Sequence, residues 1–485
     1  MKKYISILSV LVLVLGFVSL SYSAPAEIPS DTTAAVAKGQ TKITLGGDIR
    51  FRGFAINNRE VLDKESYPKG TSSLTPNRNY MDYRVQLRLK AELSPNTTGF
   101  IMLQSGTADN PNVTWGSATD GARGAYQVGN TKESQVWIHT AYIQYQGSGL
   151  LGVPAGIKIG RDIIKLGNGI FLFHTRLGDD QIMAYVQPVK ELTLALATVK
   201  FREGNSDLSD DATAYALIGA YKGKGWEVSA DVTYLDDQGN KDSTSSRGRS
   251  GWGMNSTFGA NSDIHLWNFG LRGNVDDIAG TGLGARADIE FQAGKIVNTA
   301  STYYGGYEPK FKGWAGLAGL NYKFKTIPLT LKAEYQVGSG HGDSKDIKEY
   351  VTAIGRLEGD YTTLVYEYYA PSACDSPLAR YSRETGLCNT QYVIFGGAGD
   401  ITKDLSAQLY GFWIRANKAV NINGYKDKSK DVGYEVDTMI TYKIDKNLKY
   451  WIEAGYFWPG DAWKLSNGKG PDNAWVVRHS IMLTF

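Results

Sequence analysis

Residues 475–485 read Trp-Val-Val-Arg-His-Ser-Ile-Met-Leu-Thr-Phe, and large apolar side chains alternate with polar ones along most of this stretch. One parity carries large apolar side chains: Trp475, Val477, Ile481, Leu483 and Phe485. The other parity carries polar ones: Arg478, Ser480 and Thr484. Because successive side chains of a strand point to opposite faces, the stretch predicts a strand with one apolar and one polar face.

The same alternation recurs along the chain and predicts 18 strands in all. Their expected ranges are 42–56, 79–93, 98–106, 134–147, 155–163, 180–188, 191–203, 211–222, 225–237, 261–274, 283–297, 312–325, 328–340, 391–400, 403–416, 432–444, 447–458 and 474–485. Short turns alternate strictly with longer polar loops between these strands. That alternation of connections is typical of a transmembrane antiparallel β-barrel with short periplasmic turns and long extracellular loops. An even number of strands returns both termini to the periplasm.

The two ends of the chain agree with this fold class. Lys2 and Lys3 precede an apolar run and a small-residue cleavage site, which predicts a secretory signal peptide over residues 1–23. A single membrane-anchoring helix is the alternative for this segment. A periplasmic N-terminal segment is expected over 24–41 and the barrel over 42–485. The terminal Phe485 resembles the signal that the barrel-assembly machinery reads, so we expect export to the outer membrane of a Gram-negative bacterium.

Composition excludes several function classes. The 52 basic and 49 acidic residues leave a net charge of only +3, which does not supply the concentrated basic surface of a nucleic-acid binder. The five histidines are scattered, and no Cys-x-x-Cys, Gly-x-Ser-x-Gly or other catalytic spacing is found. We therefore expect neither an enzyme nor a bound metal or cofactor.

Barrel size points to transport. A barrel of 16 to 18 strands is too wide for its own side chains to fill, and it leaves an aqueous channel unless something plugs it. The segment 24–41 is too short for a plug domain, so we expect in-folded loops to narrow the pore. The long segment 341–390 is the first candidate for that role.

Several short motifs resemble one family. Gly160-Arg161-Asp162, Leu166-Gly167-Asn168-Gly169, Asp179-Asp180, Gly433-Tyr434-Glu435-Val436-Asp437 and Gly455-Tyr456-Phe457-Trp458-Pro459-Gly460 occur along the chain. These are similar to motifs of the bacterial alginate-export family of outer-membrane porins. The resemblance implies an 18-stranded porin with a charged lumen narrowed by loops. It also implies that Arg161, Asp180, Glu435 and Asp437 are lumenal or structural charges around the pore. Alginate itself does not follow as the solute, because some related porins take others.

Charged side chains of the inward parity are candidates for lining the pore. With the family positions included, they are Arg50, Arg52, Arg84, Arg88, Lys90, Arg161, Asp180, Arg286, Glu334, Glu435 and Asp437. Rings of charge in a narrow pore select ions by sign. The arginines of the first two strands favour anionic solutes, whereas mutual pairing of charges that merely solvates the lumen is the alternative.

The only two cysteines, Cys374 and Cys388, lie within segment 341–390. The oxidising periplasm favours a disulfide between them. A metal site is less favoured, because two thiolates need two further ligands and no histidine lies between them. Two free thiols are the remaining alternative.

Two functions from different classes stay open at this point. The first is a porin that passes small hydrophilic solutes, including anionic or saccharide-like ones, by passive or facilitated diffusion. The second is a scaffold barrel around a periplasmic partner, such as a multihaem cytochrome in an electron conduit. Expected partners are outer-membrane lipid and lipopolysaccharide, the barrel-assembly machinery, and a small solute or polysaccharide.

Overall fold

The computed structural model describes residues 34–38, 41–63, 76–106, 112–115, 135–149, 152–203, 211–238, 262–299, 304–353, 362–368, 370–375, 378 and 385–485. The predicted signal peptide, residues 1–23, lies outside them. Within the described residues, no helix has the length and apolarity needed to cross a membrane.

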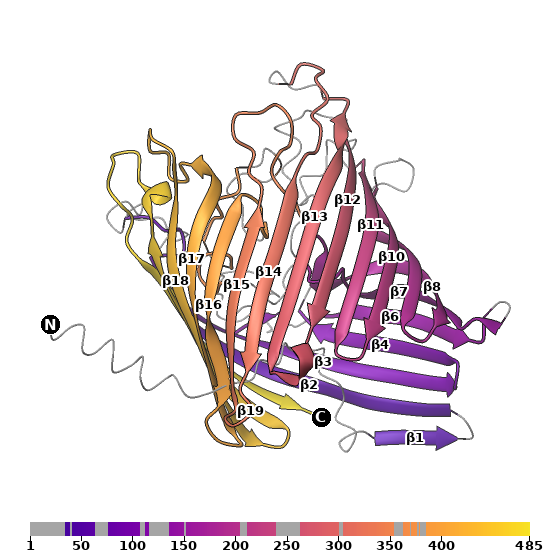
Figure 1. The fold of residues 1–485 in the computed structure, drawn as a ribbon. Coiled ribbons are helices and arrows are strands. Elements are labelled where there is room, and N and C mark those ends of the chain that lie inside the picture. Colours follow the sequence, from indigo (N-terminus) through magenta and orange to yellow (C-terminus); the bar gives the residue numbers. More distant parts are fainter. Residues whose placement is uncertain are drawn as a thin grey trace, which may run out of the picture.

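The described chain forms a closed, antiparallel barrel (Figure 1). Its strands are β1 (Ala34–Lys38), β2 (Thr41–Asn57), β3 (Asn77–Ser94), β4 (Thr97–Ser105), β5 (Val113–Thr114), β6 (Val136–Gly147), β7 (Ala155–Lys165), β8 (Phe173–Val189), β9 (Leu192–Arg202), β10 (Ala212–Gly223), β11 (Trp226–Asp237), β12 (Asp263–Val275), β13 (Leu283–Val297), β14 (Trp314–Lys323), β15 (Leu329–Gly338), β16 (Thr390–Asp400), β17 (Leu405–Val420), β18 (Ser429–Asp445), β19 (Leu448–Pro459) and β20 (Ala474–Thr484). Two short 3-10 turns, η3 (Ile278–Gly280) and η4 (Asp461–Trp463), lie between strands.

Eighteen of these strands form the wall and confirm the predicted fold class. Each wall strand pairs antiparallel with the next, and β2 pairs with β20 to close the ring. At this seam Gly47 and Phe485 exchange two backbone hydrogen bonds of 2.7 and 3.0 Å. Short turns gather at one end of the barrel, together with the C-terminus, and the long connections gather at the other (Figure 1).

Three details of the strands differ from the prediction. β8 begins at Phe173 rather than at residue 180, because the β7–β8 pairing continues past a register shift after Asp162. The short β5 pairs with β3 as an addition to the wall. β1 lies in the segment predicted as a plain N-terminal stretch and pairs with Thr41–Leu45 of β2. Those β2 residues lie beyond the end of β20, so β1 covers an edge that β20 leaves open.

The two faces of the wall have opposite character. On the outside, Ile143, Leu196 and Phe395 are 66%, 63% and 63% exposed. On the inside, Arg272 and Glu290 are buried. A soluble protein buries its apolar side chains and exposes its charged ones, and here the arrangement is reversed. A barrel surrounded by lipid requires this reversal.

Towards the loop end, the inside of the barrel holds a second apolar region, which we call the interior core. It consists of inward side chains of the wall packed against described parts of the long connections. Members include Phe54, Phe171, Leu235, Ile264, Ile296, Tyr366, Tyr392, Ile414, Phe457 and Trp463. These described parts of the connections therefore fold into the barrel.

Candidate functional site: the charged lumen

One section of the inner wall is basic. Lys449, Met482, Arg50 and Arg84 are successive register partners across β19, β20, β2 and β3. Neighbouring inward positions of the same strands add further cations. We call the full set the basic wall: Arg50, Arg52, Arg84, Arg88, Lys90, Lys449 and Arg478.

Carboxylates offset only part of this charge. Arg52 donates two hydrogen bonds of 2.8 and 2.6 Å to Asp82. Arg478 donates two of 2.6 and 2.7 Å to Glu453. These fork-to-fork pairs fix both guanidinium planes.

The rest of the basic wall is less well compensated. Asp48 alone accepts from both Arg84, at 2.8 Å, and Arg88. Lys90 contacts Glu92 at 3.1 Å. The basic wall therefore keeps more positive than negative groups after every described pair is formed.

Some of its donors have no acceptor within the described part of the chain. There, Arg50 donates a hydrogen bond from Nη2 to Asn112 Oδ1 at 3.0 Å. The buried Nε atoms of Arg50 and Arg84 and the buried Nη1 of Arg88 have no hydrogen-bond partner among the described residues. Each guanidinium carries five N–H donors, and a buried donor without a partner is costly. The side chain of Arg84 is 21% exposed and Arg50 is half-buried, so water or an anionic group in the lumen can still contact these two arginines.

A second charged cluster lies on β11, β12 and β13. Arg272 contacts Asp231 at 2.5 Å, Glu290 at 2.7 Å and Asp288 at 3.4 Å. Asn168, from the β7–β8 connection, donates to Asp288 at 3.1 Å. The connection thus covers this acidic cluster, and the single arginine is fully occupied by it.

Arg286 and Glu334 form a further closed pair. Arg286 donates two hydrogen bonds to Glu334, of 2.6 and 2.8 Å, and Lys332 approaches the same carboxylate at 3.1 Å. At Arg286 and Glu334 the charges pair with each other, which fits the alternative that lumenal charges solvate the lumen without selecting a solute. These residues link β13 and β15 across β14, and their charges are paired with each other rather than available to a solute.

Glu435 and Asp437 hold a loop against the wall. Glu435 accepts hydrogen bonds from the backbone N–H groups of Val365, at 2.5 Å, and Tyr366, at 2.9 Å. Asp437 accepts one from the N–H of Leu364 at 2.9 Å. Backbone N–H groups of a turn that have no carbonyl partner are good donors to carboxylates, because a hydrogen bond to a charged acceptor is stronger than one to a neutral acceptor. We call this contact the loop dock.

Packing reinforces the loop dock. The ring of Tyr366 lies 5.9 Å from Phe457, 6.2 Å from Tyr392 and 6.4 Å from Trp463, measured between centroids. Its hydroxyl accepts a hydrogen bond from the N–H of Ala373 at 2.8 Å. Burial raises the pKa of this hydroxyl to about 12, so Tyr366 stays neutral at physiological pH.

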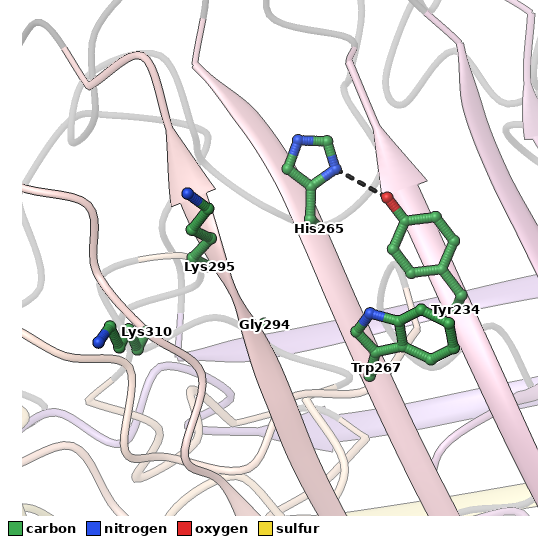
Figure 2. A pocket seen from close by; sticks show the side chains of 6 residues that line it. All are labelled: Tyr234, His265, Trp267, Gly294, Lys295 and Lys310. Carbon is green, nitrogen blue, oxygen red and sulfur yellow. Dashed lines mark hydrogen bonds between the residues drawn. The ribbon is translucent and has the colours of Figure 1, made fainter.

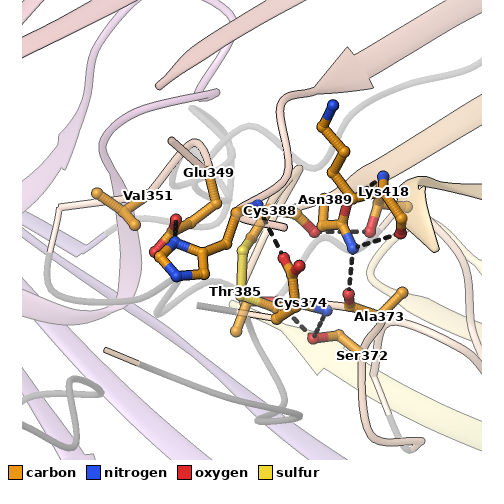
Figure 3. Close-up of a disulfide and its surroundings, with 12 residues drawn as sticks. Glu349, Val351, Ser372, Ala373, Cys374, Thr385, Cys388, Asn389 and Lys418 are labelled. Carbon is orange, nitrogen blue, oxygen red and sulfur yellow. Dashed lines mark hydrogen bonds and ion pairs between the residues drawn. A yellow bond between two sulfur atoms is a disulfide. The ribbon is translucent and has the colours of Figure 1, made fainter. Parts of the chain in front are cut away.

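A disulfide joins Cys374 to Cys388, as expected from the sequence, with an S–S distance of 2.07 Å (Figure 3). Next to it, Asn389 donates to the carbonyls of Ala373, at 2.8 Å, and Lys418, at 3.1 Å. The bridge therefore ties the loop that contains the dock to the start of β16 and to β17.

Arg161 and Asp180 are not in the lumen, and the prediction that they line the pore is wrong. They are register partners on β7 and β8, and Arg161 shares its face with Ile157 and Ile159, which are exposed on the outside. Arg161 donates two hydrogen bonds to Asp180, of 2.9 and 2.7 Å. The alternation of β7 thus places this pair on the outer surface.

Comparisons with known proteins agree with this geometry. The family model described as alginate export matches residues 45–477. OccK10 (OpdN) of Pseudomonas aeruginosa is similar in structure, with a TM-score of 0.51, 10% identity, and coverage of 91% of this chain and 99% of that one. OccAB1 of Acinetobacter baumannii gives a TM-score of 0.50, 10% identity and coverage of 95% and 100%. No curated protein sequence matches the chain.

At such low identity the two solved structures show the fold alone, whereas the family model covers most of the sequence. The fold is that of an outer-membrane porin, and the matched region runs from the first wall strand to the last. The chain belongs to the alginate export family.

Proposed function

We propose that this outer-membrane channel passes small hydrophilic solutes that carry negative charge, including acidic saccharides, by diffusion along the basic wall. One observation carries the proposal. The basic wall has more cations than carboxylates among the described residues, and the inward side chains of Arg50 and Arg84 stay partly exposed. A passing carboxylate can contact these side chains in succession, while a cation finds the carboxylates there already paired.

The interior core favours this function over the scaffold barrel. Described parts of the β7–β8 and β15–β16 connections, including Phe171, Tyr350 and Tyr366, pack inside the barrel. A cytochrome-sized partner would need the space that these side chains occupy. A narrowed lumen suits a solute of small cross-section.

Reversal potentials in planar bilayers test the proposal. Purified wild-type protein should conduct without a partner and prefer chloride to potassium. Arg50→Gln should lower that preference, and the quadruple change of Arg50, Arg52, Arg84 and Arg88 to Gln should lower it further, to the point of favouring cations.

Arg161→Gln is the matched control, because it removes the same charge from the outer face and should leave the reversal potential unchanged. Uptake into liposomes should favour glucuronate over glucosamine, which is similar in size and opposite in charge. A silent wild-type barrel, or a quadruple variant with the selectivity of the wild type, would contradict the proposal.

A further inference from the structure

The outer surface of β11, β12 and β13 changes character along the strands. Its central part is apolar, and Phe269, Leu271 and Phe291 are 42%, 55% and 51% exposed. One step towards the loop end, Tyr234, Trp267 and Ala293 are register partners. The next outward row is polar: Asp236, His265 and Lys295. Apolar, aromatic and charged side chains thus follow one another from the membrane interior towards the cell surface.

A hollow of about 410 Å³ lies at this transition on the outside of the barrel. It is lined by Tyr234, His265, Trp267, Gly294, Lys295 and Lys310. Figure 2 shows the two lysines on one side and the two aromatic rings on the other. Gly294 has a φ of +115°, and a Cβ there would lie 2.0 Å from the carbonyl oxygen of His265, so the backbone forms part of the floor.

The polar groups of the hollow are not all engaged. The Tyr234 hydroxyl and Nδ1 of His265 are 2.9 Å apart, which fixes both rings (Figure 2). Lys295 is paired with Glu308 at 2.7 Å. Lys310 lies opposite Lys295 in an isolated antiparallel bridge, and its ammonium group has no hydrogen-bond or ion-pair partner among the described residues. Asp236 contacts Nδ1 of His265 at 3.0 Å. The hollow therefore offers one ammonium group without a described partner, that of Lys310, beside a pair of aromatic faces.

We propose that this hollow binds the phosphorylated sugar headgroup of an outer-leaflet glycolipid. The lysines would pair with a phosphate, and the faces of Trp267 and Tyr234 would contact the sugar ring. The acyl chains would lie along Phe269, Phe291 and Leu271, which continue directly below. That continuity distinguishes a lipid from a soluble phosphate, because only a lipid uses the apolar surface and the cations together.

Titration of the purified barrel with diphosphoryl lipid A, followed by native mass spectrometry, tests the proposal. The wild type should bind lipid A with saturation, and Lys295→Gln with Lys310→Gln should weaken binding about tenfold, as expected when charge-assisted contacts to a phosphate are lost. Lys224→Gln with Lys325→Gln, in turns at the other end of the barrel, is the charge-matched control and should bind like the wild type. Heat-modifiable migration of each variant establishes that the barrel is folded.

Two further arms separate the sources of phosphate. Millimolar inorganic phosphate should compete only weakly with lipid A. Dephosphorylated lipid A should bind the wild type weakly, with an affinity no higher than that of the double variant for diphosphoryl lipid A. Equal lipid A binding by wild type and double variant would overturn the proposal. Full displacement by inorganic phosphate would overturn its lipid part and leave a simple anion site.

Discussion

Breaking the loop dock should make the single-channel conductance switch briefly to higher levels. Glu435→Gln with Asp437→Asn keeps the shape of both side chains and removes their negative charge. Val365 and Tyr366 donate to different oxygens of Glu435, so Gln, with a single acceptor oxygen, also loses one of these two hydrogen bonds. Losing a hydrogen bond to a charged group costs about 2 kcal/mol, and making each of the other two neutral costs roughly 1 kcal/mol, so the docking free energy falls by about 4 kcal/mol. Relief of the repulsion between the two adjacent carboxylates offsets part of this loss. We expect the undocked population to rise between about 10-fold and about 100-fold.

Single-channel recording measures this change. The variant should show brief steps to higher conductance that are rare in the wild type, because the disulfide and the packing of Tyr366 still return the loop to the wall. Glu92→Gln is the control, since it removes one inward carboxylate that contacts Lys90 and no described loop residue. Records indistinguishable from those of the wild type, in a variant that is folded and disulfide-bonded, would refute a gating role for the dock.

Three other perturbations give separate outcomes. Deleting Phe485 removes both seam hydrogen bonds, about 2 kcal/mol, and should leave unfolded protein in the periplasm, measured by heat modifiability of the membrane fraction. Reduction of Cys374–Cys388, which frees about 3 kcal/mol of loop-closure restraint in the chain-entropy model, should raise current noise with the barrel intact; labelling of both thiols in untreated, denatured protein would exclude the bridge. Partial burial opposes ionisation of Asp346, yet hydrogen bonds, led by that from Lys312, hold its pKa at about 2. The ionised form of Asp346 stabilises the fold above its unfolded pKa, and this stabilisation is lost as the carboxylate is protonated. The hydrogen-exchange protection of segment 304–312, corrected for the intrinsic exchange rate at each pH, should therefore stay constant down to about pH 4, fall as the pH approaches 2, and be low at every pH in Asp346→Asn.

The wall could be predicted because strand alternation is local. Each of the 18 predicted strands has a counterpart, and most boundaries agree within two or three residues. The parity rule also placed Arg50, Arg84 and Arg88 on the inner face. The same rule applied to β7 would have put Arg161 beside Ile157 and Ile159, on the outside; reliance on motif resemblance led to the wrong face. Lys449 and Arg478 were missed as members of the basic wall, although their positions on the last two strands share the inward parity.

The contents of the lumen could not be predicted in the same way. The dock joins residues about 70 positions apart, and nothing in the local pattern around Leu364 indicates Glu435 as its partner. The hollow on the outer surface likewise depends on Lys310, which a loop brings back to β13. Contacts of this kind follow from how the connections fold once the wall exists.

The interior core also sets an order of assembly. Its members come from nearly the whole circumference, from Phe54 on β2 through Leu235 on β11 to Phe457 on β19. The full set of contacts needs the first and last strands to be joined, and contacts between distant parts of a chain form slowly. We therefore expect the ring to close first and the connections to pack into it afterwards. A newly inserted molecule would be leakier than the mature one, and its permeability would decline at the rate at which the loops find their places.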